Sequence, residues 1–304
     1  TPEDKMNIQF LIDALSPKDK TKPPTKFDLR LEAVVIRKSN LSYDVLSEPQ
    51  KAKGIFDKNH ISITDINTDI TVPDLRNNYF TIDVRRLAFK EQSGFELRNL
   101  TTLIHIDNNH IDTKVIDISF PQSHIIINPI HLTFKDLKSL DKDINNLPLT
   151  LDIKDATITL SDFRAFAPIL KKFQHPVYLT IKAEGTINDF IIEKLHIRSE
   201  NEWLTMNCSA AIKHPLQREI AEIYAPDLQM NEVTTNLAKV LVEEGLINQK
   251  IADRISTIRY MGIDGNLNYA AKKADYRGTI ATGIGKLITD GTFRLNDKGS
   301  SFAG

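Results

Sequence analysis

Apolar and polar side chains alternate with a period of two along most of this chain, and no other feature constrains its fold as strongly. Leu29, Leu31, Ala33 and Val35 alternate with polar or charged residues such as Arg30. Because successive side chains of a β-strand point to opposite faces, this pattern predicts a strand with one apolar face. The same alternation recurs at Ile61 and Ile63; Ile82 and Val84; Ile116, Ile118 and Phe120; Ile130, Leu132 and Phe134; Leu149, Leu151 and Ile153; and Val177, Leu179 and Ile181.

Half-buried strands of this kind are typical of antiparallel sheets, since parallel strands are covered on both faces and form continuous apolar runs. Short polar and glycine-containing sequences predict turns between the strands. They are Asp107-Asn108-Asn109, Asn145-Asn146, Lys154-Asp155, Glu184-Gly185, Asp264-Gly265 and Asp290-Gly291. We therefore expect a mainly β protein built as a long meander of antiparallel hairpins.

A few short amphipathic helices interrupt the predicted strands. Apolar residues recur at helical spacing in residues 8–15, 136–146, 161–173 and 232–244. Pro168 must kink or restart the third of these helices. Residues 218–224 fit a helix or a strand equally well. We expect the helices to cover the ends or edges of the sheet.

These patterns divide the chain into four predicted segments. Residues 1–20 form an N-terminal helical segment, and residues 26–135 form a sheet of hairpins. Residues 136–215 form a β segment with the second and third helices, and residues 216–304 form a β segment with the fourth.

Charge and hydropathy argue against several classes of function. The 39 basic residues nearly balance the 40 acidic ones, so the charge gives no reason to expect a nucleic-acid-binding protein. No apolar run approaches the roughly 20 residues of a membrane-spanning helix. The first residues lack the pattern of an export signal, so we expect any signal or membrane anchor to lie outside this sequence.

No residue pattern predicts a catalytic, cofactor-binding or metal-binding site. His105, Asp107, His110 and Asp112 are the best metal candidates, but strand alternation spreads them around an exposed turn. Gly278 and Gly283 have the spacing of a phosphate-binding loop, but the required Lys-Ser/Thr does not follow, so no nucleotide site is expected. Acidic pairs such as Asp65 and Asp69 are typical of water-facing strand residues.

Three stretches resemble a known family. Residues 147–195 contain a strand pair, the element LSDFRAFAP and a further strand pair, and closely resemble TamB-like proteins of Bacteroidetes. Residues 29–44 and 258–297 resemble the hairpins repeated in AsmA-like proteins, although Ser39 stands where the family often has a glycine. The chain is thus similar to the AsmA/TamB family over most of its length.

This resemblance implies a long, strongly curved antiparallel sheet that forms a groove with an apolar concave surface. It also implies a periplasmic protein anchored in the inner membrane, with phospholipid acyl chains as partners and a role in outer-membrane biogenesis. The candidate groove residues are Leu29, Leu31, Val35, Leu149, Leu151, Ile153, Val177, Leu179 and Ile181.

Alternatives to the lipid groove remain open at this stage. The apolar strand faces could form an ordinary closed core between two sheets. The segment could instead be an assembly module whose sheet edges pair with an outer-membrane β-barrel protein. A hydrolase on a β-solenoid would need clustered acidic residues in a cleft.

Overall fold

A computed structural model describes residues 28–76, 79–136, 140, 144–215, 217, 219–296 and 299–303. Of residues 28–32, 75–76, 201, 293, 295–296 and 299–303 it describes only the backbone. The helix expected at residues 8–15, and the whole segment 1–20, lie outside the described residues. Most of the helix expected at 136–146 does too.

The described chain is mainly β, as the alternating pattern predicted. Its 18 strands belong to a single sheet. They are β1 (Asp28–Asp44), β2 (His60–Arg76), β3 (Tyr79–Glu91), β4 (Glu96–Leu97), β5 (Asn99–Ile106), β6 (His110–Thr113), β7 (Ile116–Ser119), β8 (His124–Ile127), β9 (His131–Thr133), β10 (Leu149–Ile158), β11 (Val177–Thr186), β12 (Asp189–Ser199), β13 (Leu204–Lys213), β14 (Glu222–Glu232), β15 (Met261–Ala270), β16 (Lys273–Thr282), β17 (Gly285–Asn296) and β18 (Gly299–Ala303).

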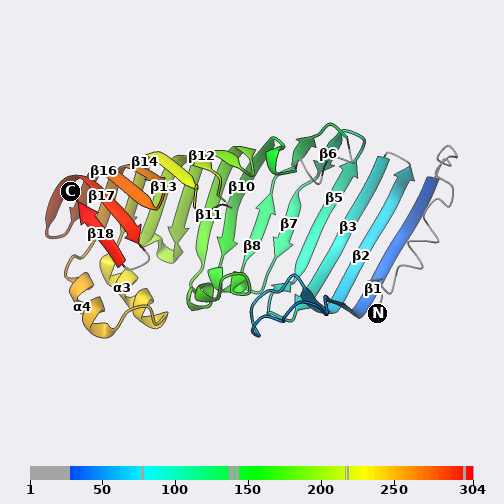
Figure 1. The fold of residues 1–304 in the computed structure, drawn as a ribbon, viewed down its shortest axis with the longest axis horizontal. Helices are drawn as coiled ribbons and strands as arrows, with labels where there is room; N and C mark the ends of the chain where they lie inside the picture. Colours follow the sequence, from blue (N-terminus) through cyan, green and yellow to red (C-terminus); the bar gives the residue numbers. More distant parts are fainter. Residues whose placement is uncertain are drawn as a thin grey trace.

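The sheet is a long, open meander in which the described strand pairs are antiparallel (Figure 1). Neighbouring strands follow the order β1, β2, β3, β5, β7, β8 and β10, and then β11 to β18 in chain order. Short strand β4 pairs with β3, while β6 and β9 extend from β5. The sheet runs unbroken across the predicted segment boundaries, through β8–β10 at residue 136 and β13–β14 at residue 216.

Helices are few, and one agrees well with its prediction. Helix α3 (Thr234–Glu243) lies within the expected range 232–244. Helix α4 (Gln249–Ser256) was not predicted, although the Asn248 side chain caps it by accepting a hydrogen bond from the Ile251 amide at 3.0 Å. The undecided stretch 218–224 contributes the start of strand β14 at Glu222.

The prediction of one helix at 161–173 is wrong. Two 3₁₀ turns occupy this stretch, Leu160–Phe163 and Pro168–Lys172, with Ala167 in an extended conformation between them. Pro168 explains the break, because a proline disfavours the helical conformation in the preceding residue. Residues Ile144–Asn146 of the expected second helix form a further 3₁₀ turn.

Three predicted turns lie inside continuous strands and are also wrong. Asp264-Gly265 and Asp290-Gly291 pair across the ladders of β15, β16 and β17. Lys154-Asp155 is a β-bulge within β10, where Asp155 has a φ of 51°. The pair Glu184-Gly185 comes just before its turn, since β11 ends at Thr186. A glycine after a polar residue therefore does not by itself mark a chain reversal.

Candidate apolar groove

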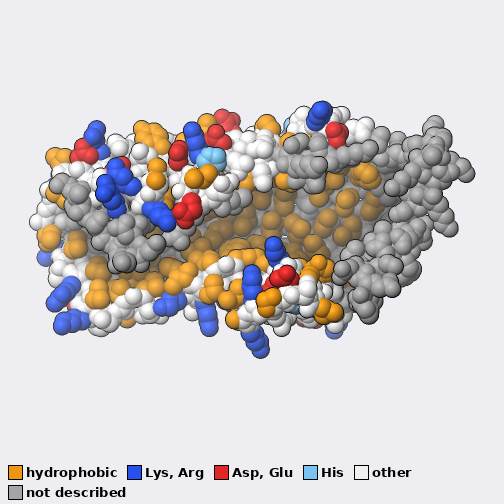
Figure 2. All heavy atoms as spheres, viewed as in Figure 1, with side chains coloured by type: hydrophobic (Ala, Val, Ile, Leu, Met, Phe, Trp, Pro, Cys, Tyr) orange, Lys and Arg blue, Asp and Glu red, His pale blue; other side chains and the backbone are white. Residues whose placement is uncertain are grey.

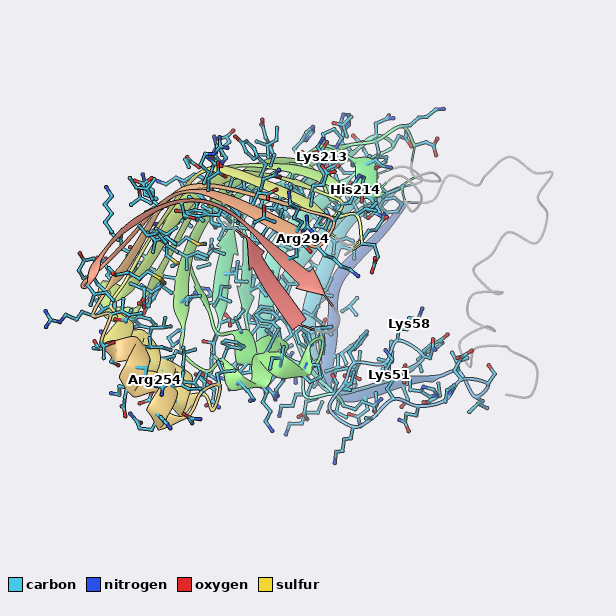
Figure 3. All side chains as sticks on the ribbon, turned by 60° about the vertical axis from the view of Figure 1, so that its left-hand side comes forward. Lys51, Lys58, Lys213, His214, Arg254 and Arg294 are labelled. Atoms are coloured by element: carbon cyan, nitrogen blue, oxygen red, sulfur yellow. The ribbon has the colours of Figure 1, made fainter. Side chains whose placement is uncertain are left out.

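β-Bulges bend the sheet into a trough. The register shifts between β10 and β11, β12 and β13, β13 and β14, and β14 and β15, each near the middle of the strands. A similar shift occurs between β1 and β2, where Lys38 and Asp65 have positive φ angles of 48° and 54°. A bulge bends its strand and increases the local twist. Figure 3 shows the resulting arch of the strands.

One face of this trough, which we call the groove floor, is mainly apolar from β2 to β16. Figure 2 shows hydrophobic side chains lining the hollow. Cross-strand pairing places successive rows on this face, such as Ile70 beside Val84 and Ile153 beside Ile181. Its N-terminal half contains Ile63, Ile70, Val84, Leu87, Ile104, Leu100, Ile118 and Ile125, and its C-terminal half contains Leu151, Ile181, Leu195, Met206, Leu228, Ile263 and Ile280.

Alanines predominate in the buried cluster of the floor. Ala183, Ile192, Ala210 and Ala225 form a buried cluster, with half-buried neighbours such as Leu151 packed against it. Alanine leaves room for the larger side chains to converge on the concave side of a bent sheet. The alternation of Val177, Leu179 and Ile181 continues to Ala183, so the sequence predicts that Ala183 lies on the floor. The bulge after Ile192 interrupts the alternation in β12, so the sequence does not predict the position of Ile192 on the floor.

The groove floor is open. The extensive contacts between described elements join neighbours in the sheet, the helices α3 and α4, or the two 3₁₀ turns at 160–172. No second sheet therefore packs over the floor within the described part of the chain. Leu151, Leu179 and Ile181 are correspondingly half-buried rather than sealed. This geometry differs from a closed two-sheet core.

The opposite, convex face is polar and carries ion pairs between neighbouring strands. Lys182 pairs with Glu193, and Arg277 pairs with Asp290 at 2.6 Å. The Glu193 carboxylate raises the pKa of Lys182 through their hydrogen bond and charge attraction. The Arg198 guanidinium lies 4.1 Å from the ring centre of Tyr178. The same strands thus present an apolar surface inward and a charged surface outward.

The structure brings together six of the nine residues predicted for the groove. Leu151 pairs with Ala183 and Ile153 with Ile181. Pairing in the same ladder places all six on the floor: Leu149, Leu151, Ile153, Val177, Leu179 and Ile181.

The other three predicted residues lie in β1. Backbone pairing of Leu29 with Leu75 and of Leu31 with Val72 places both in the ladder of β1 and β2. Val35 pairs with Asp69 and lies on the convex face, so its assignment to the floor is wrong. The cause is the register shift between Leu31 and Val34, because a slip of one residue turns every later side chain to the opposite face.

A chain of phenylalanine rings packs together at one end of the central strands. Phe166 lies 5.5 Å from Phe56 and 5.2 Å from Phe95, measured between ring centres. Phe95 lies 5.7 Å from Phe120, which lies 5.0 Å from Phe163. These contacts join the 45–59 loop and the 160–175 segment to the edge of the floor. Sequence reasoning missed the cluster because its members come from four separate connections.

Two buried polar side chains, Glu232 on the floor and Thr234 in α3, lack hydrogen-bond partners where β14 meets the helix. Glu232 is 3% exposed, and neither of its carboxylate oxygens has a hydrogen-bond partner. Burial raises the pKa of this carboxyl above its ordinary value. The hydroxyl of Thr234, two residues further on, is likewise unpartnered.

Burial also raises the pKa of the Cys208 thiol, in keeping with a small apolar residue on the floor.

The histidines and aspartates considered as metal ligands lie on the convex face, where the His110 and His131 rings stack with their centres 5.5 Å apart. His105 contacts Thr81 at 3.0 Å, His110 contacts Asp107 at 3.2 Å, and Asp112 pairs with His131. A backbone hydrogen bond from Asn109 is the main cause that lowers the pKa of Asp107. Among the described residues, no three His, Cys, Asp or Glu side chains are grouped to hold a metal ion.

Comparisons with known proteins add no relative. No protein-family model, curated protein or solved structure matches this chain. Within the part of the chain that the structure covers, no helix has the length and apolar character needed to cross a membrane.

Proposed function

We propose that this chain is a non-enzymatic segment of a cell-envelope protein whose groove carries phospholipid acyl chains through the periplasm, between the inner and outer membranes. The observation that carries the proposal is the groove floor itself, which is mainly apolar over many strands and which no second layer of described residues covers. A monomeric protein rarely leaves so extended an apolar surface without an occupant.

Acyl chains suit this surface because they need continuous apolar lining and little else. Each CH₂ group that leaves water contributes about 0.8 kcal/mol, so an acyl chain lying along several rows of the floor gains substantial affinity without any specific polar contact. The polar convex face, with pairs such as Arg277 and Asp290, keeps the outside of the trough compatible with water. The charged lipid headgroup can remain in water at the open side of the trough.

The test is lipid content, measured by native mass spectrometry on the purified chain and on floor variants. Leu151→Asp and Leu179→Arg introduce charges into half-buried floor positions, and we expect folded proteins that have lost phospholipid. Thr150→Asp and Thr180→Arg, one residue away on the convex face, are matched controls that should retain it. Collapse of the melting transition in both floor variants would identify a sealed core, and absence of lipid from the parent chain would contradict the groove.

A second candidate function is an assembly module that adds a strand of an outer-membrane β-barrel protein to its sheet. One observation favours it: the edge strand β1 exposes Val34, Val35 and Ile36, on both faces, and pairs only with β2 among the described residues. Long apolar edge strands are templates for strand addition. A chain that binds a β-barrel partner but carries no phospholipid would favour this candidate.

A further inference from the structure

Three connections between strands lie along one edge of the trough and are joined to one another: residues 45–59, 160–175 and 233–260, which together we call the basic rim. The Phe56 amide donates a hydrogen bond to the Ala165 carbonyl at 2.8 Å, which joins the first segment to the second. The Gln174 amide donates to the Glu244 carboxylate at 2.8 Å, which joins the second to the third. Figure 1 shows the three lying in a row along the lower edge of the sheet.

The exposed charge of this rim is mainly positive. Three acidic residues of these segments are buried: Asp57, Asp162 and Glu244. The exposed acidic side chains are Glu48, Glu243 and Asp253. The exposed basic side chains are Lys51, Lys53, Lys58, Lys171, Lys172, Lys239, Lys250, Arg254 and Arg259. The turn Glu200–Glu202 on the same edge adds two exposed acidic side chains, which leaves the edge basic overall.

Large apolar side chains project from the same three segments. Leu46 is 85% exposed, Ile169 56% and Phe166 55%. The others above one-third exposure are Ile55, Leu160, Val233, Ile251 and Tyr260. Several lie within a few residues of an exposed lysine or arginine, as Ile169 does of Lys171 and Ile251 of Lys250. The rim therefore combines separate apolar projections with a row of positive charges.

The opposite edge of the trough has neither property to the same degree. The exposed charged side chains that the structure describes in its turns are of both signs, among them Lys135, Asp136, Asp189, Lys213 and Glu219. Figure 3 places Lys213 and His214 on that edge, away from Lys51, Lys58 and Arg254. Figure 2 shows mainly basic side chains projecting from the lower edge and both signs along the upper one. The charge asymmetry thus belongs to the rim and not to the whole surface.

We propose that the basic rim docks on the surface of a bilayer that contains anionic phospholipids. Isolated apolar side chains can each enter the boundary between headgroups and acyl chains, while lysine and arginine meet the phosphates. A protein partner would instead require a contiguous, shape-complementary apolar patch, and the projections of the rim are dispersed along three segments. This inference goes beyond the groove's proposed cargo and rests on the rim alone.

The experiment is sedimentation of the purified chain with vesicles of phosphatidylglycerol and phosphatidylcholine, compared with vesicles of phosphatidylcholine alone. We expect binding to the anionic vesicles, and its loss in high salt, where charge attraction is screened within a few ångströms. Lys58→Glu combined with Arg254→Glu should weaken that binding at least about tenfold, given the contribution of each basic residue near an anionic surface. Lys135→Glu combined with Lys213→Glu, with the same change in net charge, should bind like the parent.

A second pair of variants tests the apolar part of the rim. Leu46→Ser combined with Ile169→Ser should also weaken vesicle binding, whereas Val115→Ser combined with Ile220→Ser, exposed residues outside the rim, should not. Equal losses for rim and control variants, or no binding of the parent to anionic vesicles, would overturn the proposal. Binding of an acidic protein without vesicle binding would overturn it in favour of a protein partner.

The readout is separable from the test of the groove. Rim variants should keep any phospholipid seen by native mass spectrometry, because the rim residues changed lie outside the floor. Floor variants such as Leu179→Arg should keep vesicle binding. A chain that binds vesicles but carries no lipid would contradict the groove proposal while supporting the rim.

Discussion

The two faces of strand β12 differ strongly in how far they bury the same residue type. Ile191 and Ile192 are adjacent and identical, yet Ile191 is 52% exposed on the convex face and Ile192 is 8% exposed on the floor. Their cross-strand partners are Ala211 and Ala210 respectively. The difference arises from the strand's alternation and the curvature of the sheet, not from the residue type.

The largest effect is expected for a charge on the floor. Ile192→Asp places a carboxylate in the buried cluster with Ala183, Ala210 and Ala225, and should reduce the free energy of unfolding by about 3 kcal/mol. Ile191→Asp, on the convex face, should change it by less than about 0.5 kcal/mol. Chemical denaturation measures both. Equal effects would mean that the two faces are not differently buried.

Substitution of a glycine at a close backbone contact on the floor should reduce stability almost as much. Gly278 faces Gly265 across β15 and β16, and a Cβ at Gly278 would lie 2.3 Å from the Asp264 carbonyl oxygen and 2.6 Å from the Gly265 Cα. Gly278→Ala should therefore destabilise the chain by about 2 kcal/mol, because backbone atoms must move.

Gly262→Ala is the matched control for this substitution. At Gly262, on the convex face of β15, an added Cβ would meet mainly the Asn231 side chain at 3.2 Å. That side chain can shift, so we expect a much smaller change in the melting temperature. A larger loss at Gly262 than at Gly278 would contradict the close approach of the two floor glycines.

The buried carboxyl of Glu232 should make stability depend on pH. Its pKa is raised in the folded chain, so its contribution to stability is fully present below the ordinary glutamate pKa and is lost as pH rises through the folded value. Glu232→Gln should therefore stabilise the chain at neutral pH, by about 1 kcal/mol after allowance for water in an open trough. The gain should shrink in acid.

Glu222 provides the comparison on the same strand. It is exposed at the other end of β14, on the convex face, and pairs with Lys213 and Ala270 through the backbone. Melting curves of Glu222→Gln should follow those of the parent at each pH. If Glu232→Gln changed the melting curves as little as Glu222→Gln, the floor beside α3 would not be desolvated.

The smallest effect is expected on the convex face. Arg277 and Asp290 form an exposed ion pair between β16 and β17. Arg277→Ala should cost at most about 0.5 kcal/mol, and the loss should fall in high salt. A double-mutant cycle with Asp290→Ala isolates the pair. A coupling energy of several kcal/mol would show that the convex face also contributes strongly to stability.

The sequence was enough to predict a long antiparallel sheet and the position of α3, because alternation and helical spacing are local. It was not enough to predict on which face of the sheet each side chain of a strand lies. The bulge near Leu31 sent Val35 to the convex face, while the unbroken alternation of Val177, Leu179 and Ile181 allowed a correct placement. Bulges depend on pairing with a partner strand, which a local pattern does not record.

The site was predictable where its residues belong to regular strands and not where they come from loops. The phenylalanine cluster and the basic rim bring together residues 45–59, 160–175 and 233–260, which no sequence spacing connects. The missed helix α4 lies in the third of these. Its Asn cap and the spacing of Ile251 and Ile255 were present, but eight residues are too few for a strong periodic signal.

Photo-crosslinking from paired positions on the two faces tests directly whether the groove floor holds lipid. A photoreactive residue at Leu179, on the floor, should form adducts with phospholipid acyl chains in cells, and the same residue at Thr180, on the convex face, should not. Mass spectrometry of the adducts identifies the lipid. Adducts from Leu179 alone are the predicted result, whereas no lipid adducts, or equal yields from both positions, would contradict a groove that holds lipid on its apolar face.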